Sequence, residues 1–444
     1  MSIFSIIRNM DKKKYSPLHI AIFTDSFLPM INGVVTAVLN LAENLADRGH
    51  SVLLVTAAPK KNQTYSYKGI RIEYIASIPA HFYKDFNWSS PYSLRIREIC
   101  KKESIQLIHF TTPFFVSFVG INVARTLGIP VIGTFHTFIS DPTNYRHFIK
   151  GNFFVVKEES VWEYSNLYYN SADFNTAPAQ STKKEMLQNG STVDIKVISN
   201  GIDPAKFDNS KAEQFKEKYT LTGKTILYFG RISQDKNIGI LLKCFFIVQS
   251  KIPEAKLLIV GDGPQLGELK DFAKRNPAGS NIIFTGGIPH HELVKSGLFG
   301  ACELFATASL TENQPMTMLE VQANGIPCVG FNVRGIPDLI IDDVNGRVLS
   351  RNDYEGMAKA IIEILNDTDL YQKYVDGTKL EVQKHLMSAV TDEWEITYQN
   401  IVESYIRGDF PRKNRFHLTQ ILAMLKEIKM NRHTGSAANS PDQP

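Results

Sequence analysis

Cysteine is scarce in this chain of 444 residues, and no apolar run is long. The four cysteines lie far apart and lack the paired Cys or His spacing of zinc modules, which predicts free thiols in a reducing compartment and no structural zinc. No stretch approaches the roughly 20 apolar residues that a membrane-spanning helix needs. The apolar residues of the N-terminus precede Lys12–Lys14, which is the reverse of a signal peptide. We therefore expect a cytoplasmic protein.

A large charge excess is also missing, because 49 Lys and Arg residues face 45 Asp and Glu residues. The positive charge is confined to the two ends: residues 1–14 carry a net +3 and residues 406–433 a net +5, while residues 15–405 carry −3. A body without positive charge argues against a nucleic-acid-binding groove. The basic ends leave an anionic membrane surface as a candidate partner.

Short apolar runs alternate with helical patterns, which is typical of parallel, doubly wound α/β sheets. The pattern restarts after a turn-rich segment, so we expect two Rossmann-like domains whose strand ends face each other across a cleft. The expected division is a basic extension (1–17), an acceptor-side N-terminal domain (18–198) completed by a helix (389–405), a C-terminal domain (199–388) and a basic tail (406–444). Strands are expected at 18–24, 51–56, 70–74, 106–110, 131–135, 193–198, 225–229, 256–260, 281–284, 304–307 and 327–330, with helices at 34–48, 92–103, 115–127, 210–219 and 237–250.

Two carboxylates eight residues apart, Glu312 and Glu320, form the strongest local signal. Pro315 fits the first turn of the following helix, so Glu312 belongs to the loop and Glu320 to the helix. The amides of Met316 and Thr317 then lie near a helix N-terminus, which favours a phosphate. On spacing alone, a helix-dipole acid plus a solvated glutamate explains the pair as well.

Arg231 and Lys236 lie in one loop between a strand and a helix. An arginine can bind a diphosphate bidentately while a lysine acts as a point charge, although ordinary solvated loop cations are the alternative.

Three further candidates follow strands. Gly33, after Asn32, opens the first strand-to-helix turn and allows close approach of a phosphate, or is a plain turn glycine. His136 and His109 end strands on the expected cleft side, although a lone histidine is often structural.

Together and in this order, these segments resemble the family 4 glycosyltransferases, which have the two-domain GT-B fold. The resemblance covers roughly residues 18–405, and it implies transfer of a sugar from a nucleotide donor with retention of configuration and without a bound metal or cofactor. It is carried by Pro29–Val34, Gly133–Thr137, Val197–Asp203, Gly230-Arg231 with Lys236, Ile259–Pro264, and the Glu312/Glu320 pair leading into Ala323–Pro327.

The resemblance also implies roles for the candidate residues. Arg231 and Lys236 would hold the donor diphosphate, Glu320 the ribose hydroxyls, and Glu312 the donor sugar. His136 would lie beside that sugar as part of the catalytic set. The implied contacts to the rest of the donor come from Gly33, Met316, Thr317, and Gly287 with Ile288, the last two bordering the base.

The chain departs from the family pattern at two places. Asn313 follows the first glutamate where glycine is usual, which bears on the local geometry around the donor sugar. Asn32-Gly33 replaces a common glycine pair, a feature shared with lipid-directed members such as diacylglycerol glucosyltransferases and phosphatidylinositol mannosyltransferases. We expect a hexosyltransferase, using UDP-glucose, that glycosylates a membrane lipid such as diacylglycerol at the inner face of the membrane. The alternatives are a mannosyl- or other hexosyltransferase with a soluble or polysaccharide acceptor, and a silent module that only binds nucleotide sugar. Asn32 and His109 are expected on the acceptor side.

The basic tail has a helical pattern in which apolar residues gather on one side with cations at its edges. This pattern predicts either an interfacial helix that docks on anionic lipid or a closing helix that packs back on the protein. The apolar positions are Phe416, Leu418, Ile421, Leu422, Leu425, Ile428 and Met430.

Overall fold

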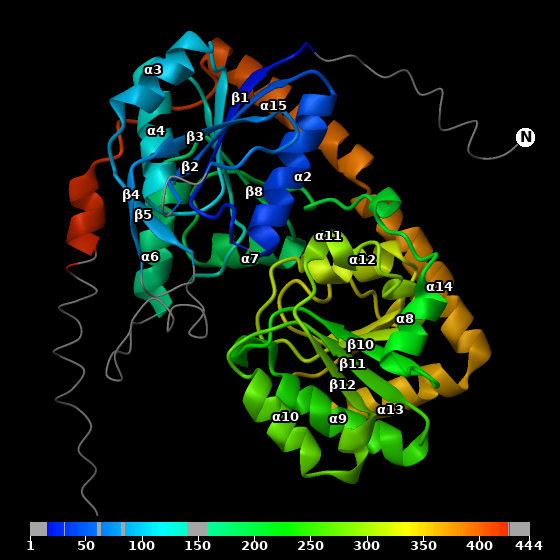
Figure 1. Ribbon diagram of the computed structural model, residues 1–444. Helices are drawn as coiled ribbons and strands as arrows, with labels where there is room; N and C mark the ends of the chain where they lie inside the picture. Colours follow the sequence, from blue (N-terminus) through cyan, green and yellow to red (C-terminus); the bar gives the residue numbers. More distant parts are fainter. Residues whose placement is uncertain are drawn as a thin grey trace, which may run out of the picture.

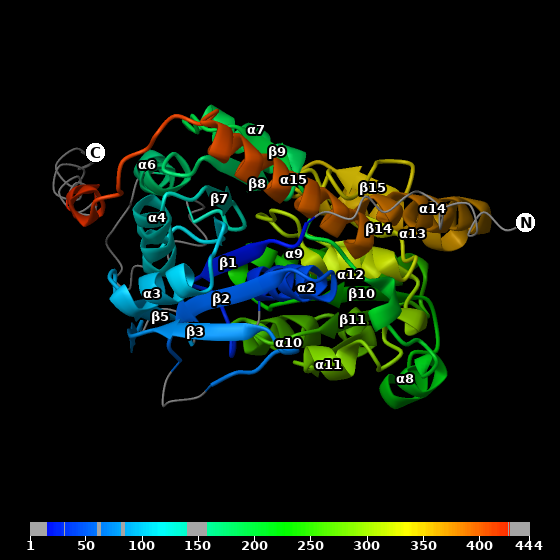
Figure 2. The same ribbon diagram turned by 90° about the horizontal axis from the view of Figure 1, so that it is seen from above.

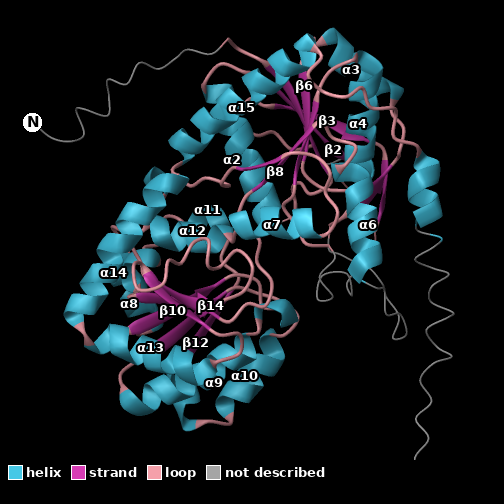
Figure 3. Cartoon of the chain, turned by 180° about the vertical axis from the view of Figure 1, so that it is seen from behind, coloured by secondary structure: helices cyan, strands magenta, loops and turns pink. Residues whose placement is uncertain are grey.

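A computed structural model of the chain describes residues 16–30, 32–59, 64–80, 85–139, 158–424 and 426. It contains two α/β domains, drawn one above the other in Figure 1, each with a parallel sheet. Figure 3 shows helices on both faces of each sheet, so the expected pair of doubly wound domains is confirmed.

The N-terminal sheet has seven parallel strands in the order β3-β2-β1-β6-β7-β8-β9. Every residue of β1 except the first is buried, which explains why this strand is apolar throughout instead of alternating. A short antiparallel hairpin, β4 (Ser77–Pro79) with β5 (Asn87–Ser89), was not expected from the sequence. The other elements are β1 (His19–Thr24), α2 (Gly33–Asp47), β2 (Ser51–Ala57), β3 (Arg71–Ile75), α3 (Leu94–Lys102), β6 (Leu107–Phe110), α4 (Phe115–Leu127), β7 (Val131–Thr134), α6 (Glu158–Tyr169), β8 (Phe174–Ala177), α7 (Gln180–Gln188) and β9 (Ile195–Val197).

The C-terminal sheet has six parallel strands in the order β12-β11-β10-β13-β14-β15. Its elements are α8 (Ala212–Tyr219), β10 (Thr225–Phe229), α9 (Ile238–Lys251), β11 (Lys256–Val260), α10 (Leu266–Lys274), β12 (Ile282–Gly286), α11 (His290–Leu293), β13 (Leu304–Thr307), α12 (Met316–Ala323), β14 (Cys328–Phe331), β15 (Gly346–Leu349), α13 (Tyr354–Asn366) and α14 (Thr368–Glu381).

In each sheet the strand order reverses beside the first strand of the domain, between β1 and β6 and between β10 and β13. Such a switch point leaves a crevice at the carboxyl ends of the strands, where doubly wound sheets bind their ligands. The loops that follow β1, β6, β10 and β13 therefore meet between the domains.

The chain crosses between the domains twice, and the two crossings pair with each other. Ile202 on the first crossing donates its amide to the His385 carbonyl at 2.8 Å, and Met387 donates to the Ile202 carbonyl at 2.8 Å. Helix α15 (Met387–Arg407) then runs back along the N-terminal domain, as Figures 1 and 2 show, where it packs on α2 and joins the core of that domain.

The tail packs on the N-terminal domain as far as the structure describes it. Phe416 and Ile421 are buried, and the Phe416 ring lies 5.1 Å from that of Phe118 and 5.0 Å from that of Tyr168. Lys413 donates to the carbonyls of residues 170 and 172. Part of the expected interfacial face thus belongs to the core, while Leu422 stays 53% exposed. Leu425, Ile428 and Met430 lie outside the described side chains, as does the N-terminal lysine cluster.

No helix of the described part is long and apolar enough to cross a membrane.

Candidate active site

A cavity of about 640 Å³ lies between the two domains at the carboxyl ends of their strands. It is lined from both domains, and it brings together residues that are far apart in the sequence, from Ser26 to Glu320. Every candidate from the sequence except His109 lines it: Asn32, Gly33, His136, Arg231, Lys236, Gly287, Ile288, Glu312, Met316, Thr317 and Glu320.

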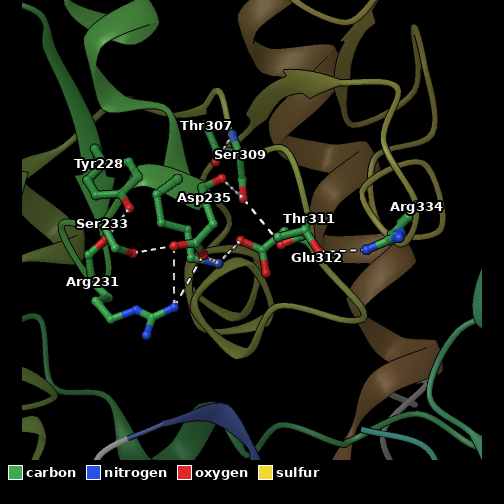
Figure 4. A network of polar contacts seen from close by, with 10 residues as sticks. Tyr228, Arg231, Ser233, Asp235, Thr307, Ser309, Thr311, Glu312 and Arg334 are labelled. Atoms are coloured by element: carbon green, nitrogen blue, oxygen red, sulfur yellow. Dashed lines mark hydrogen bonds and ion pairs between the residues drawn. The ribbon is translucent and has the colours of Figure 1, made fainter. Parts of the chain in front are cut away.

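The two cations of the β10 loop are held by buried carboxylates. Lys236 Nζ lies 2.7 Å from Glu312 Oε1 and 3.4 Å from Asp235 Oδ2, and Arg231 Nη2 lies 3.3 Å from the same Asp235 oxygen. Ser233 donates its hydroxyl to Asp235 Oδ1 at 2.5 Å. Figure 4 shows Asp235 between Arg231 and Glu312. The carboxylate of this one buried acid thus lies close to both cations, Arg231 and Lys236.

These charges fix their own protonation states. Burial would lower the pKa of Lys236, but Glu312 and then Asp235 outweigh it, so the pKa lies above its usual value. Burial would raise the pKa of Asp235, but Lys236 and Arg231 outweigh it, so the pKa lies below its usual value. The loop therefore presents two positive charges to the cavity at neutral pH.

Two glycines let a second loop pack on the backbone that carries Arg231. A Cβ on Gly261, whose φ is +151°, would lie 1.8 Å from the Gly230 carbonyl oxygen, and one on Gly263 would lie 2.1 Å from the Ile232 oxygen. The Gly261-Asp262-Gly263 turn thus supports the loop in a way that larger residues would prevent.

Glu320 and His290 form a second polar pair at the cavity. Glu320 is 3% exposed, and its Oε1 lies 3.0 Å from His290 Nε2. Among the described residues, no group hydrogen-bonds Glu320 Oε2, which leaves a buried acceptor at the cavity. The hydrogen bond to Glu320 raises the pKa of His290 more than burial lowers it.

Two helix N-termini, one from each domain, point at the same space. Asn32 caps α2 by accepting from the Val35 amide at 3.0 Å, and a Cβ on Gly33 would lie 3.5 Å from the Met316 side chain. Met316 and Thr317 open α12, while Pro315 occupies the position before the helix instead of its first turn. Free amides at these positions provide hydrogen-bond donors for an anion.

The two candidate histidines have different places. His136 is half-buried on the cavity wall, and burial lowers its pKa to about 4, so it is neutral at pH 7. His109 is not at the site, and its assignment to the acceptor side is wrong. It is buried in the sheet, with Nδ1 2.8 Å from the Tyr398 hydroxyl and Nε2 2.6 Å from Thr134 Oγ1. The helix that supplies Tyr398 is distant in sequence, so the strand pattern gave no sign of this contact.

The N-terminal side of the cavity has an apolar wall. Met30, Phe86 and Phe114 are almost fully buried, and the Phe86 and Phe114 rings lie 5.5 Å apart, edge to face. Val34 and Ile139 complete this wall. Polar side chains, among them Ser26, Thr112 and His136, line the rest of this side.

Sequence reasoning missed Asp235, His290 and Arg334. Asp235 could have been recognised as the acid between two site cations, whereas nothing local marks His290, four residues after the turn at Gly286. Arg334 Nη1 donates to Thr311 Oγ1 at 2.7 Å, just before Glu312 (Figure 4).

No three Asp, Glu, His or Cys side chains group closely enough to hold a metal ion in the described part of the chain.

Comparison with known proteins shows that both domains match family models of glycosyltransferases. A family model described as "Glycosyltransferase Family 4" matches residues 31–206, and one described as "Glycosyl transferases group 1" matches residues 209–380. An alpha-monoglucosyldiacylglycerol synthase of Streptococcus pneumoniae is 31% identical, over 82% of this chain and 82% of its own. A GDP-mannose-dependent alpha-mannosyltransferase of Corynebacterium glutamicum is 25% identical, over 79% and 82%. The structure of Anabaena HepE in complex with UDP superposes with a TM-score of 0.69 at 18% identity, covering 86% of this chain and all of that one.

Proposed function

Because the chain belongs to the family 4 glycosyltransferases, of GT-B fold, we propose that it transfers glucose from UDP-glucose to a membrane lipid such as diacylglycerol, with retention of configuration and without a bound metal. The observation that carries the donor half is the pairing of Arg231 and Lys236 at the β10/β13 switch point, ordered by Asp235 and Glu312. The acceptor half rests on the apolar wall and on the alpha-monoglucosyldiacylglycerol synthases among the relatives.

The cations suit the leaving group. When the bond between the anomeric carbon and the diphosphate oxygen breaks, negative charge grows on the nucleoside diphosphate. Arg231, Lys236 and the amides of Met316 and Thr317 stabilise that charge with groups already in place, a contribution that a metal ion makes in other enzymes. The acceptor hydroxyl oxygen forms the new bond to the anomeric carbon, and its proton passes to the oxygen of the departing diphosphate.

The remaining polar residues suit the sugar and the ribose. Glu320 Oε2 is a buried acceptor without a partner among the described residues, as a ribose hydroxyl requires. Glu312 and the neutral His136 border the space in which the donor sugar would lie. Retention by front-face substitution and by a covalent intermediate both fit this arrangement.

A panel assay tests the proposal. Purified full-length protein is incubated with UDP-glucose, UDP-galactose or GDP-mannose, and with diacylglycerol or phosphatidylinositol in mixed micelles. We expect α-glucosyldiacylglycerol from UDP-glucose, with the anomeric configuration read by NMR. Mannosyl transfer from GDP-mannose, an activity that the name of one relative states, would overturn the donor assignment. Transfer only to soluble sugars would overturn the lipid acceptor, and binding without turnover would indicate a silent module.

We further propose that exposed cations of the tail draw the enzyme to an anionic membrane surface on the inner face. Arg412, Arg415 and Lys426 are exposed, beside the exposed Leu422, whereas Lys413 is held by backbone carbonyls. Each exposed cation near such a surface contributes about 1 kcal/mol.

Reversing these three charges to Glu should weaken sedimentation with phosphatidylglycerol-containing vesicles, more at low than at high salt. The matched control reverses three exposed lysines of the C-terminal domain, Lys270, Lys274 and Lys379. Equal binding of both variants and the wild type would show that the tail cations do not bind the membrane.

A further inference from the structure

The loop that carries Glu312 is tied to the opposite domain by the side chain of its next residue. Asn313 Nδ2 donates to the Phe135 carbonyl oxygen at 2.7 Å, and Asn313 Oδ1 accepts from the Thr182 hydroxyl. Phe135 follows β7 directly before His136, and Thr182 lies in the first turn of α7. Asn313 belongs to the C-terminal domain, and both the nitrogen and the oxygen of its side-chain amide thus form hydrogen bonds with the N-terminal domain.

The orientation of this amide is determined by its partners. A carbonyl oxygen can only accept, so the NH₂ group must face Phe135 and the amide oxygen must face Thr182. Phe135 and Thr182 are 1% and 0% exposed, respectively, so both partners of the amide lie in the interior of the N-terminal domain, while Asn313 itself is half-buried at the cavity. Hydrogen bonds in such surroundings are costly to leave unmade.

The backbone of the same loop is fixed from its own domain. Gly335 donates its amide to the Glu312 carbonyl at 3.0 Å. A Cβ at Gly335 would lie 1.4 Å from the backbone carbonyl oxygen of Asn313, so only glycine fits there. The loop is therefore held between the Gly335 turn on one side and the His136 loop on the other. Gln314, the next residue, accepts from the Asn200 amide at 2.7 Å on the first domain crossing.

We infer that Asn313 is a positioning residue, which sets Glu312 of the C-terminal domain and His136 of the N-terminal domain in register across the cleft. The inference rests on the proposed function in that it assigns Glu312 to the donor sugar. It goes beyond it by making the placement of that carboxylate depend on the approach of the two domains. Releasing Asn313 would displace Glu312, and with it the Lys236 ammonium 2.7 Å away, while leaving Arg231 and Glu320 in place.

The test compares Asn313→Ala with Ser181→Ala. Ser181 makes another hydrogen bond between the domains, from its amide to Asp338 Oδ2 at 3.1 Å and from its hydroxyl to the same oxygen, without touching the Glu312 loop. With UDP-glucose and diacylglycerol, Asn313→Ala should lower kcat about 10²-fold, as a displacement of about 1 Å does. The donor KM should stay within about threefold, since Arg231 and Glu320 do not depend on Asn313 for their positions. Ser181→Ala should change neither.

A double-mutant cycle distinguishes loss of the Asn313 link between the domains from general destabilisation. Thr182→Val removes one partner of Asn313 while preserving shape, so it should lower kcat less than Asn313→Ala does. The double variant should be no slower than Asn313→Ala alone, because both changes break one link. Additive losses, an unchanged kcat in Asn313→Ala, or an equal loss in Ser181→Ala would each overturn the inference.

Hydrogen exchange without substrate keeps this test independent of the assigned activity. In Asn313→Ala, peptides covering 309–318 and 134–139 should exchange faster than in the wild type, and in Ser181→Ala they should not. If the wild type shows no transfer, the proposed function fails while this exchange result still decides the role of Asn313. Unchanged exchange in Asn313→Ala would show that Asn313 does not hold these two loops together.

Discussion

Replacing the two site cations one at a time should separate catalysis from folding stability. The side chain of Lys236 is 18% exposed and lies between the carboxylates of Glu312 and Asp235, which are 15% and 3% exposed. Lys236→Ala leaves both acids without this cation, although Asp235 keeps Ser233 and Arg231. Breaking a buried pair from one side costs about 3 kcal/mol.

Arg231 contacts Asp235 at a longer distance, 3.3 Å, and its side chain is 38% exposed. Arg231→Ala should therefore cost less than about 1 kcal/mol of folding free energy. Both variants remove a cation from the leaving diphosphate, so both should lose about 10²–10³ in kcat at saturating donor.

The assays are turnover and thermal unfolding without donor, with Lys274→Ala as an exposed control in the same domain. At about 2–4 °C per kcal/mol for a domain of this size, Lys236→Ala should melt roughly 6–12 °C lower and Arg231→Ala within about 4 °C of wild type. Equal melting temperatures for the two variants would refute the claim that Lys236 neutralises buried acids. Near-normal turnover in either would refute the diphosphate assignment.

Three further outcomes are expected. Glu320→Ala should mainly raise the donor KM, because a ribose contact is present in both ground and transition states. Glu312→Ala should mainly lower kcat, because the sugar changes during transfer. Equal effects of the two variants on KM alone would contradict these separate roles. His290→Gln should remove a stabilisation that is present below about pH 6.5 and is lost as pH rises through the raised pKa of His290. The melting temperature of the variant should therefore approach that of wild type between about pH 6 and 9. A difference that stays constant with pH would argue against the ion pair of His290 with Glu320. Transfer should persist in EDTA, and loss of activity that manganese or magnesium restores would show a metal requirement.

The fold was largely predictable because its buried parallel strands are continuous apolar runs. Thr225–Phe229, Lys256–Val260 and Leu304–Thr307 were expected with the bounds that the structure has. Besides the β4–β5 hairpin, two strands of the parallel sheets were missed, β8 and β15, because they carry polar residues. In β8 the fully buried Asn175 donates to the Tyr169 carbonyl at 2.9 Å, and β15 is an edge strand that contains Arg347.

The donor side of the site was predictable because its residues follow strands at the switch points of their sheets. What the sequence could not show are contacts between segments far apart in the chain. The Glu320 contact of His290, the reach of Asn313 across the cleft and the burial of His109 under Tyr398 all depend on how folded elements meet. Local pattern carries no information on such meetings.

The placement of α15 has a consequence for the order in which the protein completes itself during synthesis. Trp394 and Tyr398 of α15, and Phe416 and Ile421 of the tail, belong to the hydrophobic clusters of the N-terminal domain. The C-terminal domain forms its sheet from one continuous stretch of chain, and its core cluster draws on residues 202–382 apart from Ala37 of α2. The N-terminal domain, which is synthesised first, therefore keeps part of its core uncovered until residues 394–421 are made, and the C-terminal domain can complete its core before it.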